Sequence, residues 1–194
     1  MTRWSAPVMH ARCRPVDTFD DELATLVADM VATMYAADGV GLAANQVGVD
    51  LRVFVFDCHD EDDGRHRGVV CNPVLTVPEG RDRVLDESDE GCLSLPGAFA
   101  PLARADFASI VGVDQHCEPV AISGSGFLAR CLQHEYDHLE GVVFGDRLPN
   151  RARRKLFKEA ERHAEHYAPD WPASPESRVA ADIDAAADAP PDIA

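Results

Sequence analysis

Apolar residues recur at helical spacing early in the chain. Within DTFDDELATLVADMVATMYAADG (17–39) they fall three or four positions apart, and Gly39 follows the last of them. This spacing places them on one face of an amphipathic helix, and a glycine is typical of the residue after a helix end. The apolar stripe consists of Leu23, Leu26, Val27, Met30, Val31 and Met34. We therefore expect a helix whose apolar face packs into the core.

The middle of the chain has the composition of strands. LRVFVFDC (51–58) is rich in β-branched and aromatic residues, which is typical of a buried strand. Shorter strands with turn residues between them are predicted at 68–77, 81–88, 107–114 and 119–124. HDEDDGRHRG (59–68) is predicted to be a charged loop. Its acidic and histidine residues lack a fixed ligand spacing, so a solvated loop is favoured over a metal site.

Two more helices are expected towards the C-terminus. SGSGFLARCLQHEYDHLEG (123–141) has serines that can cap its start and Gly141 at its end. A last helix is predicted near PNRARRKLFKEAERHAEHY (149–167). A helix, several antiparallel strands and then helices, without βαβ alternation, indicate an α+β fold. We expect antiparallel sheets packed around the 123–141 helix, with one N-terminal and one C-terminal helix.

Composition divides the chain into a domain and a tail. A length of 194 residues with 46% hydrophobic residues suits one globular domain, which we place at residues 1–167. The tail, 168–194, is rich in Ala, Pro and Asp and poor in large apolar residues, so we expect it to be disordered. Six scattered cysteines do not form a disulfide framework, and most are expected to be buried apolar residues.

Charge and hydropathy exclude two classes of partner. The formal net charge of −16 argues against direct binding to a nucleic-acid backbone, which requires clustered Lys and Arg. No apolar run has the length of a membrane span, and MTRWSAPVMHARCRP at the start contains no continuous apolar stretch. We therefore expect a cytoplasmic protein without a signal peptide or membrane contact.

The strongest chemical signal is QHEYDHLEG (133–141). On a helix, His134 and His138 lie one turn apart on the same face, and Cys131 extends that face with an apolar residue, so both imidazoles should point inward. Two such imidazoles can bind one metal ion. Glu135 lies about 100° around the helix from His134, where it can act as a general base without binding the metal. The alternative is a helix in which the HExxH letters occur by chance.

Sequence spacing alone does not identify the third metal ligand. One protease pattern places a histidine where this chain has Phe144, which cannot bind metal. Another takes a downstream glutamate, for which Glu159 or Glu161 is a candidate, although a solvated helix face explains both. Cys92 in DESDEGCLSLPG (86–97) would complete three ligands and leave one open position, as in catalytic sites.

Two further groups of residues could support a reaction at these ligands. DGVGLAANQVG (38–48) combines glycines that permit close approach of a substrate with Gln46, whose amide can donate to a developing oxyanion. Arg104 is a candidate partner for Asp137, which would orient the helix that carries the histidines. Two ordinary surface charges are the alternative for that pair.

Three segments together resemble the signature motifs of the peptide deformylase family: GVGLAANQ (39–46), EGCLS (90–94) and QHEYDHLEG, in this order. The resemblance covers roughly residues 8–150. It implies metal ligands at Cys92, His134 and His138, the catalytic Glu135, and oxyanion donors at the Gln46 side chain and the Leu93 N–H. It also implies substrate contacts by residues of the first motif and a methionine pocket beside the helix. These substrate-binding residues are Val40, Gly41, Phe127, Leu128 and Cys131.

The resemblance also implies a reaction and its partners. The enzyme would hydrolyse the N-formyl group of nascent N-formylmethionyl peptides and release formate, with one divalent metal ion per chain. Ferrous iron is expected in the cell, and Zn²⁺, Ni²⁺ or Co²⁺ can occupy such a Cys/His/His site as well. The ribosome is a candidate partner, for which RARRKLFK (151–158) is the basic segment. The rivals are an HExxH metalloprotease and a formyl-peptide-binding relative without turnover, although a pure binder has no need of Glu135 as a base.

Overall fold

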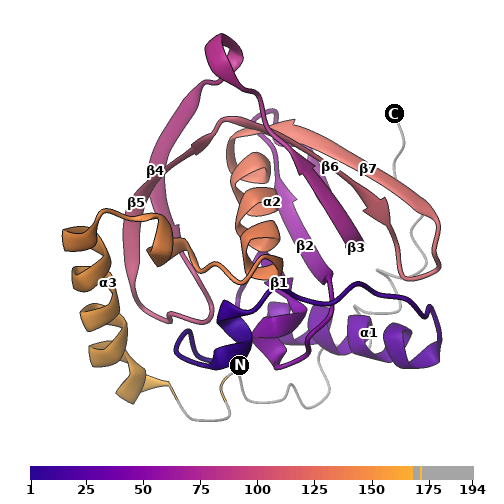
Figure 1. Ribbon diagram of the computed structural model, residues 1–194, viewed down its shortest axis with the longest axis horizontal. Helices are drawn as coiled ribbons and strands as arrows, with labels where there is room; N and C mark the ends of the chain where they lie inside the picture. The colour runs from indigo at the N-terminus through magenta and orange to yellow at the C-terminus, as the bar shows by residue number, and fades with distance from the viewer. Residues whose placement is uncertain (168–170, 172–194) are drawn as a thin grey trace.

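The computed structural model describes residues 1–167 and 171. Within these residues the chain forms three α-helices and two antiparallel sheets, which confirms the α+β class (Figure 1). The helices are α1 (Asp21–Ala36), α2 (Gly126–Leu139) and α3 (Asn150–His163). The tail that was predicted to be disordered lies outside the described residues, apart from Trp171.

The larger sheet has five strands in the order β1-β2-β3-β6-β7. These strands are β1 (Gly41–Ala43), β2 (Val53–His59), β3 (Arg65–Thr76), β6 (Phe107–Val113) and β7 (Pro119–Ser125). The smaller sheet pairs β4 (Leu85–Gly91) with β5 (Phe99–Ala105), with Gly91 opposite Phe99. Every pairing in both sheets is antiparallel.

Two strands, the first residues of β3 and the last residues of β4 were not predicted, and the strand predicted at 81–88 begins only at Leu85. Strand β1 is only three residues long, too short for a periodic pattern. Strand β5 contains Pro101 and three alanines and buries the charged Arg104, so its sequence is only weakly apolar. The predicted loop at 59–68 is wrong at its end, because Arg65 already pairs with His59 across the hairpin. Arg65 also donates to Asp57, which compensates for its charge in the strand.

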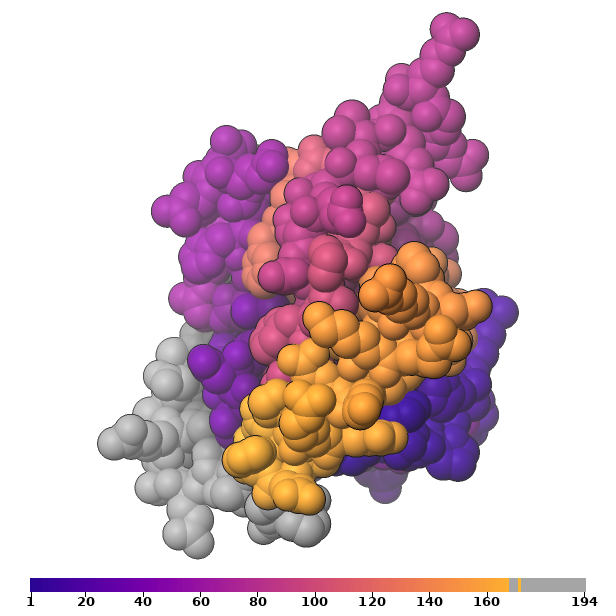
Figure 2. Space-filling model, turned by 90° about the vertical axis from the view of Figure 1, so that its left-hand side faces the viewer, coloured from indigo at the N-terminus to yellow at the C-terminus, as the bar shows by residue number. Residues whose placement is uncertain are grey.

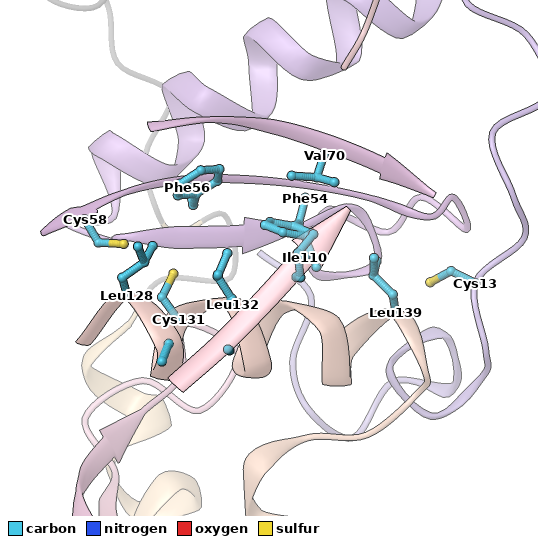
Figure 3. Packing of buried hydrophobic residues seen from close by; sticks show 13 residues of the cluster. Cys13, Phe54, Phe56, Cys58, Val70, Ile110, Leu128, Cys131, Leu132 and Leu139 are labelled. Atoms are coloured by element: carbon cyan, nitrogen blue, oxygen red, sulfur yellow. The ribbon is translucent and has the colours of Figure 1, made fainter. Parts of the chain in front are cut away.

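Strand β2 of the five-stranded sheet is covered on both faces. Phe54, Phe56 and Cys58 of β2 belong to the core cluster between β2 and α2 (Figure 3). The alternating residues Val53 and Val55 pack instead with the apolar face of α1. Because both faces are covered, β2 is a continuous apolar run rather than an alternating one.

Helix α2 lies between the two sheets (Figure 1). It contacts β1, β2, β6 and β7 on one side and β5 on the other. Most of its residues are buried, including the polar Gln133, His134 and Asp137. A helix buried on nearly every side can carry polar side chains only where each has a partner or a chemical role.

Helix α3 covers the outer side of the smaller sheet (Figure 2). Leu156 and Ala160 of this helix pack with Leu102 of β5 and with Phe144, which follows α2. These residues belong to a third apolar cluster, which also includes Leu95 and Ala98 of the loop after β4. None of the helices within residues 1–167 is both long and apolar enough to cross a membrane.

We expect Gly141→Ala to destabilise the protein more than Gly80→Ala does. Both glycines have a positive φ, 75° and 60°, which costs an alanine roughly 1–2 kcal/mol. A Cβ at Gly141 would also lie 2.8 Å from backbone atoms of His10 and Ala11, whereas a Cβ at Gly80 meets nothing within 4 Å. The added loss of about 1–3 kcal/mol from overpacking can be measured by chemical denaturation followed by circular dichroism. Equal losses of stability in the two variants would contradict the close contact of Gly141 with the backbone of His10 and Ala11.

Candidate functional site

Three metal-binding side chains meet between α2 and the loop after β4. The Nε2 atoms of His134 and His138 lie 3.1 Å apart, and the Sγ atom of Cys92 lies 3.3 Å from Nε2 of His138. All three donor atoms lie within 4.8 Å of one another. Bond lengths of about 2.0–2.3 Å in a tetrahedral site separate ligand atoms by about 3.3–3.6 Å. The cluster therefore has the dimensions of a site for one small divalent ion.

Local structure explains why these residues converge. The spacing of four on α2 places both imidazoles on the same helix face. Strand β4 ends at Gly91, and the Leu95 N–H donates to the Cys92 carbonyl in a tight turn that holds the thiol against the helix. The glutamates that would complete a metalloprotease site, Glu159 and Glu161, are on α3 and are not part of this cluster.

A buried carboxylate, Glu90, orients the first histidine. Nδ1 of His134 donates to Oε1 of Glu90 over 2.7 Å, which leaves Nε2 to face Cys92 and His138. Arg104 donates two hydrogen bonds to Glu90, of 3.0 and 2.6 Å, and Arg130 donates a third of 2.9 Å. Burial opposes the charged carboxylate, but the bonds from His134 and Arg104 outweigh it and hold the pKa of Glu90 far below its usual range. Glu90 is therefore ionised.

The two histidines differ in their preferred protonation. Burial lowers the pKa of His138 well below its usual value, and the neighbouring His134 lowers it further. Burial acts in the same direction on His134, but hydrogen bonds to Cys92 and Glu90 outweigh it and raise the pKa of that imidazole. His138 is thus held as the neutral imidazole, which is the form that binds metal ions.

Arg104 and Asp137 form the pair that the sequence suggested. Arg104 donates to Asp137 over 2.6 Å, and Arg147 also donates to this carboxylate. Only 5% of Arg104 and 3% of Asp137 is exposed, so the alternative of two surface charges is wrong. Arg104 consequently bridges Glu90 on β4 and Asp137 on α2.

Glu135 faces the cavity with an unsatisfied carboxylate. The residue is buried, and its Oε2 atom has no hydrogen-bond partner among the described residues. Burial raises the pKa of Glu135 to about 7, against the opposing charge of His134. A Cβ on Gly41 would lie 2.4 Å from Oε1 of Glu135, so only glycine leaves room for the carboxylate. Glu135 is therefore placed to accept and donate a proton near neutral pH.

The side-chain amide nitrogen of Gln46 points towards Cys92 and Ser94. The Ala43 N–H donates to Oε1 of Gln46 over 2.9 Å, which fixes the orientation of the amide. Nε2 of Gln46 consequently lies 3.5 Å from Sγ of Cys92 and 3.3 Å from Oγ of Ser94. Leu93, which follows Cys92, lines the same cavity.

A cavity of about 530 Å³ opens beside these groups. Its size falls in the range of about 300–1,000 Å³ that is usual for small-molecule sites. Of the residues suggested for substrate contact, Val40, Gly41, Phe127 and Cys131 line it. Leu128 does not line the cavity, because it is fully buried in the core cluster between α2 and the sheet. We therefore remove Leu128 from the expected pocket.

Several residues of the site had no role in the sequence analysis. Glu90 and Arg130 stand within or beside the quoted motifs, but their pairing across β4 and α2 depends on tertiary contacts. Two aromatic residues from the C-terminal part of the chain, Tyr167 and Trp171, also line the cavity. No spacing pattern connects these two residues with the motifs, which begin at Gly39.

The chain was compared with known proteins. The family model described as polypeptide deformylase matches residues 1–154. Peptide deformylase 2 of Streptomyces coelicolor is 55% identical over 160 residues, which cover 82% of this chain and 88% of that protein. Peptide deformylase 1 of Streptomyces avermitilis is 51% identical over 161 residues, or 83% of this chain and 74% of that protein. The crystal structure of a peptide deformylase from Legionella pneumophila is similar with a TM-score of 0.77 and 37% identity, covering 86% of this chain and 95% of that one.

We expect Glu90→Gln to weaken zinc binding about 10- to 100-fold, because partners that orient a ligating histidine typically have effects of this size. The matched control is Asp57→Asn, which also removes a carboxylate bound by an arginine and by Tyr35, but one that forms no hydrogen bond to Cys92, His134 or His138. Both variants should lose stability, and only Glu90→Gln should lose zinc affinity in competition with a chelator. Unchanged zinc affinity in Glu90→Gln would contradict its orienting role.

Proposed function

The chain belongs to the peptide deformylase family, and we propose that Cys92, His134 and His138 hold its catalytic metal ion. The protein is accordingly a metal-dependent hydrolase that removes the N-formyl group from nascent peptides and releases formate. The observation that carries the site assignment is the convergence of one thiol and two imidazoles within 4.8 Å, beside the cavity that Glu135 faces.

The donor set supports a small divalent ion in this position. One sulfur and two nitrogen donors suit Fe²⁺, Zn²⁺, Ni²⁺ and Co²⁺, and three protein ligands leave a position open for chemistry. We propose Fe²⁺ as the ion in the cell and the other three as substitutes. An ion at this site supplies Lewis-acid chemistry, which lowers the pKa of water and polarises a carbonyl oxygen.

Glu135 performs the proton transfers in this proposal. Its Oε2 atom, which has no partner among the described residues, takes a proton from the water that attacks the formyl carbon. When the C–N bond breaks, the same carboxyl returns this proton to the leaving nitrogen. The products are formate and a free amino terminus, so the atoms balance with one water consumed.

Gln46 and Leu93 stabilise the charge that develops on the formyl oxygen. Nε2 of Gln46 points towards Cys92 and Ser94 because its Oε1 is fixed by the Ala43 N–H. We propose that this amide and the Leu93 N–H both donate to the oxyanion. Both donors belong to segments held by backbone hydrogen bonds, from the Thr2 N–H to the Gln46 carbonyl and from the Leu95 N–H to the Cys92 carbonyl.

The methionine side chain is proposed to lie near α2. Phe127 and Cys131 line this side of the cavity, and 51% of Phe127 is exposed at its rim. Val40, whose carbonyl lies 3.6 Å from Sγ of Cys131, and Gly41 are proposed to contact the substrate as well. Apolar and sulfur-containing contacts suit a methionine thioether.

The proposed catalytic domain comprises residues 1–167, of which the family model matches 1–154. The rival metalloprotease lacks its third ligand, because the cluster contains Cys92 rather than a glutamate of α3. Association with the ribosome through 151–158 stays a proposal, which Arg154 and Lys155, both exposed on α3, support by their charge.

We expect formate release from formyl-Met-Ala-Ser by protein purified without oxygen, whose metal content identifies the ion. Cys92→Ala should lose the metal and the activity, and Glu135→Gln should keep the metal but not the activity. Gln46→Leu should reduce turnover by about 10²–10³-fold with the metal retained, as for other lost oxyanion donors. A metal-loaded wild type that releases no formate would overturn the proposal, and so would cleavage of internal peptide bonds.

We expect Gly41→Ala to lower kcat by about 10²-fold, because a displacement of about 1 Å in a catalytic group has effects of this order. The added methyl group would push the Glu135 carboxylate, 2.4 Å away, out of its position. Gly68→Ala is the control, since a Cβ there meets the ring of Phe56 at an ordinary 3.5 Å. Metal content and melting temperature should distinguish a displaced base from a damaged fold. Full activity of Gly41→Ala would show that Glu135 tolerates the shift.

A further inference from the structure

Two aromatic residues complete the cavity from outside the family's matched region. Tyr167 and Trp171 both line it, and both lie beyond residue 154, where the match to the family model ends. The proposed catalytic groups, by contrast, all lie between Gln46 and His138. This wall of the cavity is therefore a feature of the C-terminal part of the chain, which Figure 2 shows in yellow below α3.

The aromatic pair is held in a defined position. The rings of Tyr167 and Trp171 contact each other edge to face with centroids 5.0 Å apart. The guanidinium of Arg3 lies 5.8 Å from the centre of the Tyr167 ring and donates to the Tyr167 carbonyl over 3.3 Å. The Met1 amine donates to the Trp171 carbonyl over 3.0 Å. These contacts fix both residues in place, so the two rings form a defined wall of the cavity.

The segment that holds the pair is itself fixed to the proposed site. The Thr2 N–H donates to the carbonyl of Gln46 over 2.7 Å, and the Trp4 N–H donates to the carbonyl of Ser94 over 3.1 Å. Gln46 and Ser94 flank Cys92. The N-terminal residues thus connect the aromatic pair with both loops of the catalytic centre.

The chemistry of the cavity indicates what this wall recognises. Its volume of about 530 Å³ exceeds what one methionine side chain requires, so following residues of a peptide also enter it. Leu93 and Pro96 line the cavity together with the two aromatic rings, and Asp38 and Asp89 add negative charge. Arg130 also lines the cavity, but its guanidinium is bound to Glu90 and Asp86. Such a lining favours an apolar side chain and disfavours an acidic one.

We propose that Tyr167 and Trp171 are specificity-determining residues, which bind an apolar side chain in the two residues after the formylmethionine. This inference rests on the proposed function, since it concerns the same cavity and the same substrate. It assigns to the C-terminal part of the chain a direct contact with the nascent peptide. The aromatic rings would pack against that side chain and exclude water from it.

The test compares kcat/KM for formyl-Met-Phe-Phe and formyl-Met-Ser-Ser in the full-length, metal-loaded protein. The wild type should prefer the phenylalanine peptide, and Trp171→Ala and Tyr167→Ala should each reduce this preference roughly 2- to 10-fold, the size of aromatic pair contacts. Trp171→Phe should retain most of the preference. General damage to the enzyme would lower both rates together and leave their ratio unchanged.

Phe157→Leu is the control variant, because Phe157 stacks on Trp4 at 4.2 Å but does not line the cavity. Its peptide preference should equal that of the wild type. An unchanged preference in both alanine variants would overturn this inference and leave the proposed function intact. A wild type without formate release from either peptide would overturn both.

Discussion

The burial of Glu90 is the constraint on which the site depends. A carboxylate removed from water costs several kcal/mol unless charged partners surround it. Here Arg104, Arg130 and His134 all donate to it. Because Glu90 stands two positions before Cys92, the same contacts that stabilise its charge also hold the thiol at the two histidines. Glu90 and its three partners therefore contribute both to the packing of the core and to the position of the proposed metal ligands.

The charged residues around Glu90 also explain the placement of α2 between the sheets. Arg104 connects Glu90 on β4 with Asp137 on α2, so the small sheet and the helix are joined by charge as well as by apolar contacts. On its other side, α2 packs on the β2 core through Leu128 and Leu132. The helix is thus fixed from both sides, and its histidines have little freedom to move.

The two ends of the cavity have different origins. The proposed reacting groups come from three short segments that lie close together, as the side chain of Glu135 against Gly41 illustrates. The outer wall is built from Tyr167 and Trp171, held by residues near Met1. The same N-terminal residues also bond to Gln46 and Ser94, so the outer wall is connected to the loops around Cys92.

Local periodicity and short motifs in the sequence predicted the three helices and most strands, and they singled out Cys92, His134 and His138 as the proposed metal ligands. It did not predict β1 or β5, since a three-residue strand and an alanine-rich strand have little pattern. Leu128 illustrates another limit: its motif position suggested the pocket, and only packing decided that it faces the core. The partners of Glu90, the space that Gly41 leaves and the wall from Tyr167 were likewise decided by tertiary structure, because each joins residues far apart in the chain.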